Sequence, residues 1–321
     1  MRKKIIILAG DPNSINSEII YKVWKKLKNL EKKDIIILGN FDLLFDQFKK
    51  LNIKINIFKI KKIDEYQSPK YLKIIDVPLK YRNPFKVSYK NSSKYVQKIL
   101  ALGHKLAIDK LVKGLINCPI NKNLLNRART IGVTEFLAAK CNINDSSEVM
   151  MIHNKNLSVV PLTTHINIRD ISKNIHTDLI IKKVKTLNNN FKKLFSKKPR
   201  IGILGLNPHN SEFKNNSEEM LHIKPAILKL KKKRINISGP FAADTMFIDN
   251  YKKYDVIVGM FHDQILTPFK TLFRYDAINI TLGLKYMRVS PDHGPAVDLI
   301  GLNKGNYLSL FKCIKFIKNL N

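Results

Sequence analysis

Three histidines share one local pattern: each closes a short polar turn that follows an apolar, β-rich run. The runs span residues 157–165, 201–209 and 255–262 and end at His165, His209 and His262. Because the ends of parallel strands meet at one edge of an α/β sheet, we expect the three imidazoles to be delivered to one place. Three imidazoles can hold one divalent metal ion and leave coordination positions open for substrate. The pattern therefore predicts a metal-dependent enzyme.

Two further groups of residues carry weaker signals. Lys270, Asn279 and Arg288 lie downstream of His262, and Lys and Arg donate charge-assisted hydrogen bonds to phosphate or carboxylate. In a chain with 58 basic residues, however, a Lys or Arg at any one position means little. The segment Asp292–Ala296 (DHGPA) has small residues that let backbone approach a ligand closely. Its alternative interpretation is a surface turn before the last helix.

The elements that would position these residues alternate between apolar runs and helical periodicity. This alternation predicts an α/β fold with a mostly parallel sheet. The predicted strands are Ile5–Ala9, Ile35–Gly39, Ile55–Ile60, Leu72–Val77, Gly114–Cys118, Val149–Ile152, Leu157–Leu162, Ile201–Leu206, Val256–Met260 and Ile278–Thr281. The predicted helices are Ser17–Leu30, Ser92–Lys113, Thr134–Cys141, Leu179–Phe195, Glu218–Lys233 and Tyr307–Leu320.

The charge of the chain is unusual, since 58 Lys and Arg against 25 Asp and Glu give +33 over 321 residues. Such a balance can indicate binding to nucleic acid or to an anionic membrane. Lysine is spread along the whole chain, however, and no Arg-rich stripe or aromatic-interleaved patch is present, which favours compositional drift. No apolar stretch approaches the ~20 residues that span a bilayer. We therefore expect neither nucleic acid nor membrane as a partner.

The cysteines indicate the compartment. Cys118, Cys141 and Cys313 are far apart and odd in number, so they predict neither a disulfide framework nor a Cys-based zinc site. The apolar run at Ile5–Ala9 is shorter than the ~7–15 residues of a signal-peptide core. Both observations are typical of a cytoplasmic protein.

Several motifs, in order, resemble one family. They are Thr163–Asp170 (TTHINIRD), Gly205–His209 (GLNPH), Gly239–Phe247 (GPFAADTMF), His262–Gln264 (HDQ), Asn279–Gly283 (NITLG) and Asp292–Gly294 (DHG). Each motif alone is weak, but together they are highly specific. In these motifs the chain resembles the 4-hydroxythreonine-4-phosphate dehydrogenases of the pyridoxal phosphate pathway.

The resemblance implies an isocitrate-dehydrogenase-like fold with two α/β/α subdomains and an active-site cleft between them. Residues 1–128 plus 284–321 would form the first subdomain, with the cofactor loop, and residues 129–283 the second, with the metal site and the dimer interface. The resemblance also implies a homodimer in which His165 and His209 of one subunit meet His262 of the other at a divalent metal (Zn, Mg, Mn or Co).

The other site residues are carried over from the family in the same way. Substrate would be bound by Thr134, Lys270, Asn279 and Arg288, and NAD or NADP by Asp292, His293 and Gly294. Lys270, Asp244 and Asp263 are the catalytic candidates. The implied reaction is the oxidation and decarboxylation of 4-phosphooxy-L-threonine to 3-amino-2-oxopropyl phosphate. The alternatives are a D-threonate or D-erythronate 4-phosphate dehydrogenase of the same family and, from another class, a basic nucleic-acid-binding protein on an enzyme fold.

The chain departs from the family pattern in two places. Val133 precedes Thr134 where the family has a histidine that helps to hold substrate, so a polar contact is lost. Ser14, Asn16 and Ser17 stand where the family has Gly, Gly and Pro, in a loop near the cleft. These departures leave open a shift of substrate to a related phosphorylated hydroxy acid.

Overall fold

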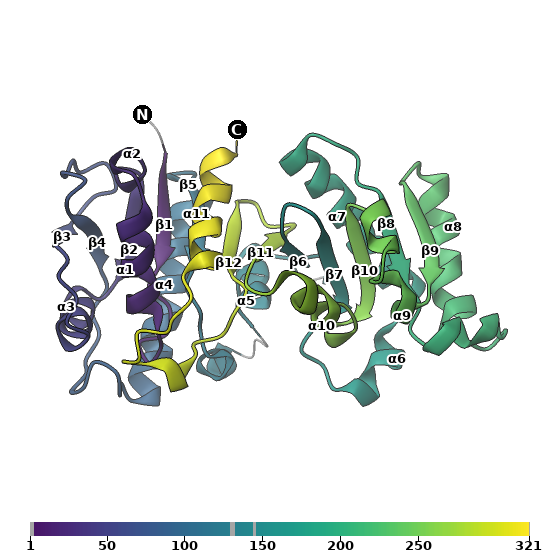
Figure 1. Cartoon of the computed structure of the whole chain (residues 1–321), viewed down its shortest axis with the longest axis horizontal. Coiled ribbons are helices and arrows are strands. Elements are labelled where there is room, and N and C mark those ends of the chain that lie inside the picture. The colour runs from purple at the N-terminus through teal and green to yellow at the C-terminus, as the bar shows by residue number, and fades with distance from the viewer. Residues whose placement is uncertain (1–2, 129–131, 144–145, 321) are drawn as a thin grey trace. The chain divides into compact units, whose positions relative to one another are not determined.

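The computed structural model describes residues 3–128, 132–143 and 146–320, and for residues 126–128 only the backbone. The chain forms two compact units, Met1–Cys141 with Leu284–Asn321 and Asn142–Gly283 (Figure 1). The division expected from sequence lies at residue 129, outside the described residues. Helix α5 (Val133–Lys140) contributes Phe136 and Leu137 to the core of the first unit.

The first unit contains the following elements. They are β1 (Lys4–Leu8), α1 (Asn16–Lys26), α2 (Asn29–Lys32), β2 (Ile35–Gly39), α3 (Phe41–Lys50), β3 (Ile57–Ile60), β4 (Leu72–Asp76), α4 (Tyr89–Ile108), β5 (Val112–Asn117), η1 (Lys122–Ala128), α5, β12 (Arg288–Pro291), η6 (Val297–Leu299) and α11 (Leu308–Asn319).

The second unit contains a similar alternation. Its elements are β6 (Val149–His153), β7 (Ser158–Thr163), η2 (Ile168–Asp170), α6 (Ile171–Asn174), α7 (Thr177–Phe195), β8 (Ile201–Leu204), η3 (Pro208–Phe213), η4 (Glu219–Ile223), α8 (Lys224–Lys232), β9 (Ile237–Phe241), α9 (Ala243–Met246), η5 (Asn250–Lys253), β10 (Val256–Phe261), α10 (His262–Phe273) and β11 (Ile278–Leu282).

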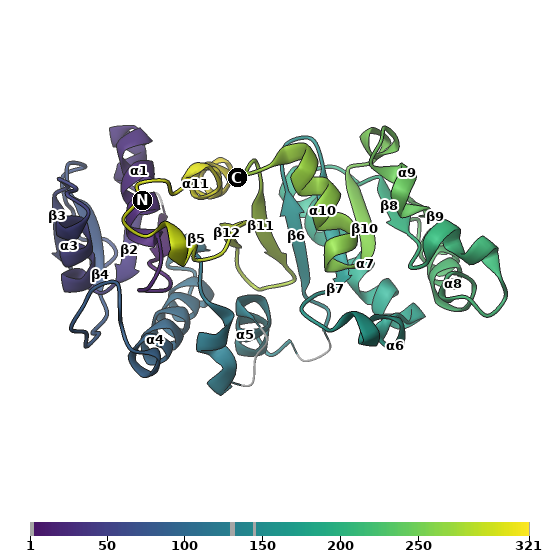
Figure 2. The ribbon, with the colours of Figure 1, turned by 60° about the horizontal axis from the view of Figure 1, so that its bottom comes forward.

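In the first unit the strand order is β3-β4-β2-β1-β5-β12, and every pairing is parallel. Helices α1 and α11 cover one face of this sheet and α4 and α5 the other (Figure 2). Strands covered on both faces are expected to be apolar throughout. Ile5–Leu8 and Ile35–Leu38 are accordingly buried along their whole length.

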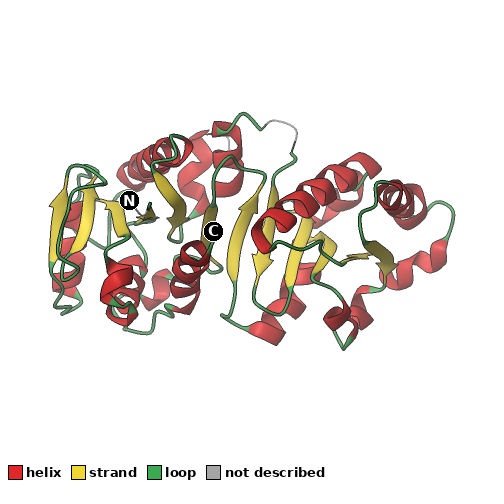
Figure 3. Ribbon diagram, turned by 90° about the horizontal axis from the view of Figure 1, so that it is seen from above, coloured by secondary structure: helices red, strands yellow, loops and turns green. Residues whose placement is uncertain are grey.

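In the second unit the order is β11-β6-β7-β10-β8-β9. Strand β10 pairs in parallel with β7 and β8, and β8 with β9, whereas β6 is antiparallel to β7 and β11. Helices flank the strands of each unit on both sides (Figure 3). The structure thus confirms the predicted α/β class and mostly parallel sheet.

All ten predicted strands are present, but the strands β9 and β12 and the helices α3, α6, α9 and α10 were not predicted. β9 and β12 each contain a proline, in Gly239-Pro240 and at Pro291, and proline normally signals a turn. Helix α10 contains Pro268. The helix predicted for residues 92–113 ends at Ile108, because Val112 and Lys113 begin β5.

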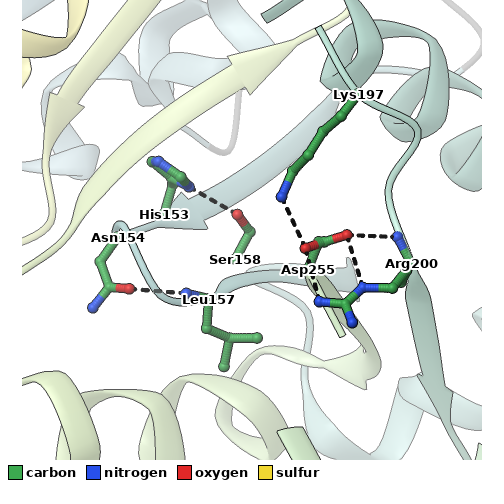
Figure 4. Close-up of polar contacts among 7 residues, drawn as sticks. All are labelled: His153, Asn154, Leu157, Ser158, Lys197, Arg200 and Asp255. Carbon is green, nitrogen blue, oxygen red and sulfur yellow. Dashed lines mark hydrogen bonds and ion pairs between the residues drawn. The ribbon is translucent and has the colours of Figure 1, made fainter. Parts of the chain in front are cut away.

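Polar contacts hold the N-terminal ends of strands in the second unit (Figure 4). Asp255, just before β10, accepts hydrogen bonds from Lys197 Nζ at 3.0 Å and Arg200 N at 2.9 Å. Burial acts to raise the pKa of Asp255, but hydrogen bonds from Arg200 and Lys197 outweigh it and lower that pKa to about 2. These contacts fix the start of β10, and its far end carries His262.

The described ranges contain no helix whose length and apolarity would let it cross a membrane. Cys118, Cys141 and Cys313 are all free thiols and buried.

Candidate active site

The three strand-end histidines follow neighbouring parallel strands of the second unit. His165 lies two residues after β7, His262 is the first residue of α10 directly after β10, and His209 lies in η3 after β8. Strand β10 is hydrogen-bonded to β7 on one side and to β8 on the other. The three side chains therefore leave the same edge of the sheet, as the sequence pattern predicts.

Two of the imidazoles lie close together within one chain. The ring centroids of His165 and His262 are 6.1 Å apart. His262 Nδ1 is 2.6 Å from a carboxylate oxygen of Asp263, which orients the ring and directs Nε2 away from the carboxylate. Among the described residues no group of three His, Cys, Asp or Glu side chains is arranged to hold a metal ion. One chain alone thus does not assemble the three-histidine set.

The backbone that carries two of these histidines is unusual. His165 has φ 24°, and residues 209–213 form a run with φ between 48° and 57°. Left-handed conformations cost L-residues about 1–2 kcal/mol each, so they persist only where surrounding contacts enforce them. One such contact is made by Asn210, which is buried and donates from Nδ2 to Pro240 O at 3.3 Å.

Side chains at the strand ends tie the three turns together. Gln264 accepts from Met260 N at 2.7 Å and donates to Gly205 O at 2.7 Å, joining the ends of β10 and β8. Thr163 Oγ1 donates to Met260 O at 2.7 Å, joining β7 and β10. A Cβ at Gly205 would lie 2.0 Å from Asn210 Oδ1, so this close packing requires glycine. Gln264 and Thr163 were not predicted as site residues, although both lie in motifs around the histidines.

The remaining predicted residues of the second unit lie on different elements. Lys270 is exposed on α10, two helical turns after His262. Asn279 is half-buried on β11, and its Oδ1 receives no hydrogen bond from the described residues. Asp244 is exposed at the first turn of α9 and accepts from Thr245 N at 2.9 Å.

In the first unit the structure brings Arg288 and Thr134 together. Arg288, 2% exposed, donates from Nη1 to Thr134 Oγ1 at 3.4 Å and from Nε to Asn117 Oδ1 at 2.6 Å. Burial lowers the pKa of Arg288 to about 10, which leaves the side chain a cation at neutral pH. Sequence reasoning missed Asn117, a polar residue at the end of β5. Val133 is half-buried and packs against the apolar core of the unit.

The predicted cofactor loop is also in the first unit. Asp292 N donates to Ser309 Oγ at 2.9 Å, and His293 Nδ1 is 3.0 Å from Gly294 O. Gly294 is exposed, and a Cβ there would meet no atom within 4 Å, so its backbone is open to a ligand. The loop contacts the N-terminal turn through Ile15 N, which donates to Pro295 O at 3.2 Å.

The N-terminal turn, where the chain departs from the family pattern, is closely packed. Asn16 Nδ2 donates to Ala9 O and Pro119 O, both at 2.9 Å, and so links the segments after β1 and β5. Ser14 Oγ donates to Asp11 O at 2.5 Å. A Cβ at Gly10 would lie 2.5 Å from Asn16 Nδ2, and Gly10 has φ 77°. The polar side chains in this turn are therefore part of its structure.

The chain is similar in sequence to known proteins over nearly its whole length. Residues 31–317 match the family described as pyridoxal phosphate biosynthetic protein PdxA. A 4-hydroxythreonine-4-phosphate dehydrogenase of Aquifex aeolicus (strain VF5) is 36% identical over 323 residues, covering 100% of this chain and 99% of that protein. A protein of Oceanobacillus iheyensis, named provisionally as a D-threonate 4-phosphate dehydrogenase, is 31% identical over 315 residues, which cover 94% of this chain and 93% of that protein.

Solved structures agree with the sequence relatives. The crystal structure of a 4-hydroxythreonine-4-phosphate dehydrogenase from Klebsiella pneumoniae matches with a TM-score of 0.85 and 28% identity, covering 98% of each chain. An isocitrate dehydrogenase from Methylococcus capsulatus matches with a TM-score of 0.50 and 10% identity over 99% of this chain and 85% of that one, which is a likeness of fold alone.

Proposed function

The chain belongs to the PdxA family of pyridoxal phosphate biosynthetic proteins, and we propose that it converts 4-phosphooxy-L-threonine to 3-amino-2-oxopropyl phosphate in pyridoxal 5′-phosphate (vitamin B6) biosynthesis. It is an oxidoreductase of that family. The observation that carries the proposal is the end-to-end match with a dehydrogenase of this name. In the reaction, hydride leaves the C3 carbinol carbon for NAD(P)⁺, the hydroxyl proton is released, and the resulting 3-keto acid loses CO₂.

The metal ligands in this proposal are His165 and His209 of one subunit with the partner subunit's His262. Neutral imidazoles suit divalent transition metals, and all three histidines leave one edge of the sheet. Zn, Mg, Mn or Co, when bound, would act as a Lewis acid that acidifies the substrate hydroxyl and stabilises negative charge on that oxygen. Asp263 holds the His262 ring through Nδ1, which keeps Nε2 as the free ligand atom. The three-histidine set requires the homodimer.

The chain's charged and polar residues would hold the two ends of the substrate. Arg288 is a buried cation supported by Thr134 and Asn117, which suits a phosphate or carboxylate oxygen. Lys270 would steer the phosphate or relay a proton, and Asn279 would add a polar contact. Asp244 and Asp263 are the acids near the metal. The open backbone at Gly294, next to Asp292 and His293, supports a place for NAD or NADP.

We expect the purified protein to reduce NAD⁺ or NADP⁺ only when 4-phosphooxy-L-threonine and a divalent metal ion are both present. One CO₂ should be released for each NAD(P)H, because oxidation and decarboxylation follow each other on the same substrate. NAD(P)H absorbance coupled to CO₂ detection measures both, and a chelator provides the control. Absence of dinucleotide reduction with Zn, Mg, Mn and Co alike would contradict the proposal.

A second candidate substrate class is favoured by Val133. Its apolar side chain packs against the core where the family has a substrate-holding histidine, and one relative is named provisionally for D-threonate 4-phosphate. The alternative is therefore a D-threonate or D-erythronate 4-phosphate dehydrogenase. A panel of the three phosphorylated compounds, compared by kcat/KM, separates the two functions.

We expect Val133→His to lower KM for 4-phosphooxy-L-threonine roughly tenfold, the size of one hydrogen bond to a charged group. The valine is the first residue of α5 and is half-buried against the core of the first unit. Initial-rate kinetics give KM, and Val133→Ala serves as the size control. An unchanged or higher KM would indicate a pocket rebuilt for another substrate.

The net charge of +33 is the one observation that favours a function of another class, that of a basic nucleic-acid-binding protein on an enzyme fold. Binding through phosphate contacts weakens steeply with salt, so a salt titration against DNA and RNA separates it from the enzyme. We propose a cytoplasmic enzyme without nucleic-acid or membrane partners, which three free, buried thiols support.

A further inference from the structure

Two adjacent carboxylates, Glu218 and Glu219, lie between the turns that carry His165 and His209. Glu219 begins η4 and is 0% exposed. Its Oε1 accepts hydrogen bonds from Leu206 N and Asn207 N, both at 2.8 Å. Those two residues directly precede the turn Pro208–Phe213 that contains His209. Glu219 thus holds the entry to this turn.

Glu218 extends the same contact to the other histidine turn. Asn207 Nδ2 donates to Glu218 Oε2 at 2.7 Å and to Glu219 Oε2 at 3.1 Å. Glu218 Oε1 accepts from the Ser172 hydroxyl. Ser172 lies in α6, which continues η2 and the segment that carries His165. Through Asn207 and Ser172, the two carboxylates fasten both turns to one point.

The choice of a carboxylate at position 219 has a physical cost. A buried carboxylate needs strong compensating contacts, and no Lys, Arg or His in the described part of the chain forms an ion pair with Glu219. Its compensation comes from backbone and amide N–H groups of residues 206 and 207. Gly205 allows the approach, because a Cβ there would lie 3.0 Å from Glu219 Oε1.

We infer that Glu218 and Glu219 are positioning residues for the metal ligands: together they set the spacing of the His165 and His209 turns. This inference rests on the proposed three-histidine metal site and deepens it. Both histidines have positive φ, so their turns lack the hydrogen bonds of regular secondary structure. Contacts from neighbouring residues must therefore fix the position of each turn. Residues that orient metal ligands without touching the metal themselves commonly matter for metal affinity, which falls 10–100-fold when they are removed.

The test is Glu219→Gln, measured in the intact protein by Co²⁺ titration at its d–d absorption band and by Zn²⁺ competition. The new amide can still accept from the N–H groups of 206 and 207, but its NH₂ faces Asn207 Nδ2. If the Asn207 amide turned over to accept from this NH₂, its Oδ1 would face the Glu218 carboxylate, and two hydrogen-bond acceptors would be in contact. We therefore expect metal binding to weaken about 10–100-fold and the Co²⁺ spectrum to change.

A rescue variant makes the inference sharper. In Glu218→Gln combined with Glu219→Gln, Asn207 can turn so that its Oδ1 accepts from both new amides, and Ser172 keeps its acceptor. The double variant should recover most of the metal affinity lost in the single variant. Loss of affinity that simply adds up across the two substitutions would contradict this hydrogen-bond network.

The control variant is Glu212→Gln, an exposed glutamate in the same turn as His209 that should leave metal binding unchanged. Melting temperatures of the metal-free variants establish that each is folded under the titration conditions. If the wild-type protein binds no Co²⁺ or Zn²⁺, the proposed metal site fails. If the wild-type binds and Glu219→Gln binds equally tightly with an unchanged spectrum, the positioning role is overturned and the metal site stands.

Discussion

Replacing His209 by alanine is expected to abolish metal binding and to reduce turnover on the order of a thousand-fold, while the protein stays folded. In the proposed site, loss of one of three imidazoles would remove the Lewis acid, and Lewis-acid stabilisation of developing charge is worth several kcal/mol. His209 is exposed, so few packing contacts disappear with it. The measurements are metal content after dialysis, NAD(P)⁺ reduction and the elution volume of the protein in gel filtration.

The control for His209→Ala is His176→Ala. His176 caps α7 by accepting a hydrogen bond from Leu179 N at 3.0 Å. His176→Ala should therefore lower the free energy of unfolding by about 1 kcal/mol and leave the metal content unchanged. Full activity of His209→Ala in metal-free buffer would refute the three-histidine site.

Mixing two inactive variants is expected to restore activity, because the proposed site is shared between subunits. In a mixed dimer of His209→Ala and His262→Ala, one site carries both defects and the other carries none. Isolated mixed dimers should therefore have about half of the wild-type activity, and an unfractionated mixture formed by random pairing about a quarter. Co-expression with two affinity tags isolates the mixed dimers, whose turnover is then compared with that of each parent.

The matched control is a mixture of His165→Ala and His209→Ala, which should stay inactive. Those two residues belong to the same half-site, so every site in a mixed dimer lacks one ligand. The opposite outcome is informative too, since His165 and His262 lie 6.1 Å apart within one chain. If no mixture regains activity, the ligands come from a single subunit and the shared site is refuted.

The strands before the three histidines were predictable because they are long apolar runs that end in polar turns. What sequence could not supply is their spatial order, since β8 and β9 precede β10 in the chain but β10 lies between β7 and β8. This insertion is what makes His262 a neighbour of His165. Helix α10, which begins at His262, was not predicted because it contains Pro268. This proline lies in the second turn, and the helix continues to Phe273.

The supporting residues were harder to find than the ligands. Glu219 lies in a predicted helix, where a glutamate is normally solvent-exposed, and its burial follows from the unpaired N–H groups that a strand end presents. Asn117 likewise is one of many asparagines until the fold brings Arg288 beside it. Residue type and local pattern identify groups that do chemistry, whereas long-range pairing identifies the groups that hold them.

The packing of Asn16 has a consequence for how freely the N-terminal turn can be changed. Its side chain donates to Ala9 O and Pro119 O, so Asn16→Gly would take one donor from each carbonyl, and Pro119 O would keep the hydrogen bond from Asp11 N at 3.1 Å. A lost hydrogen bond of this kind costs about 1 kcal/mol. The neighbouring residues fit that side chain closely, since a Cβ at Gly10 would lie 2.5 Å from Asn16 Nδ2 and Ser14 Oγ accepts from Asn16 N at 3.2 Å. The turn thus depends on a side chain at position 16, and substitutions there should loosen the contact between the segments that follow β1 and β5 as well as the turn itself.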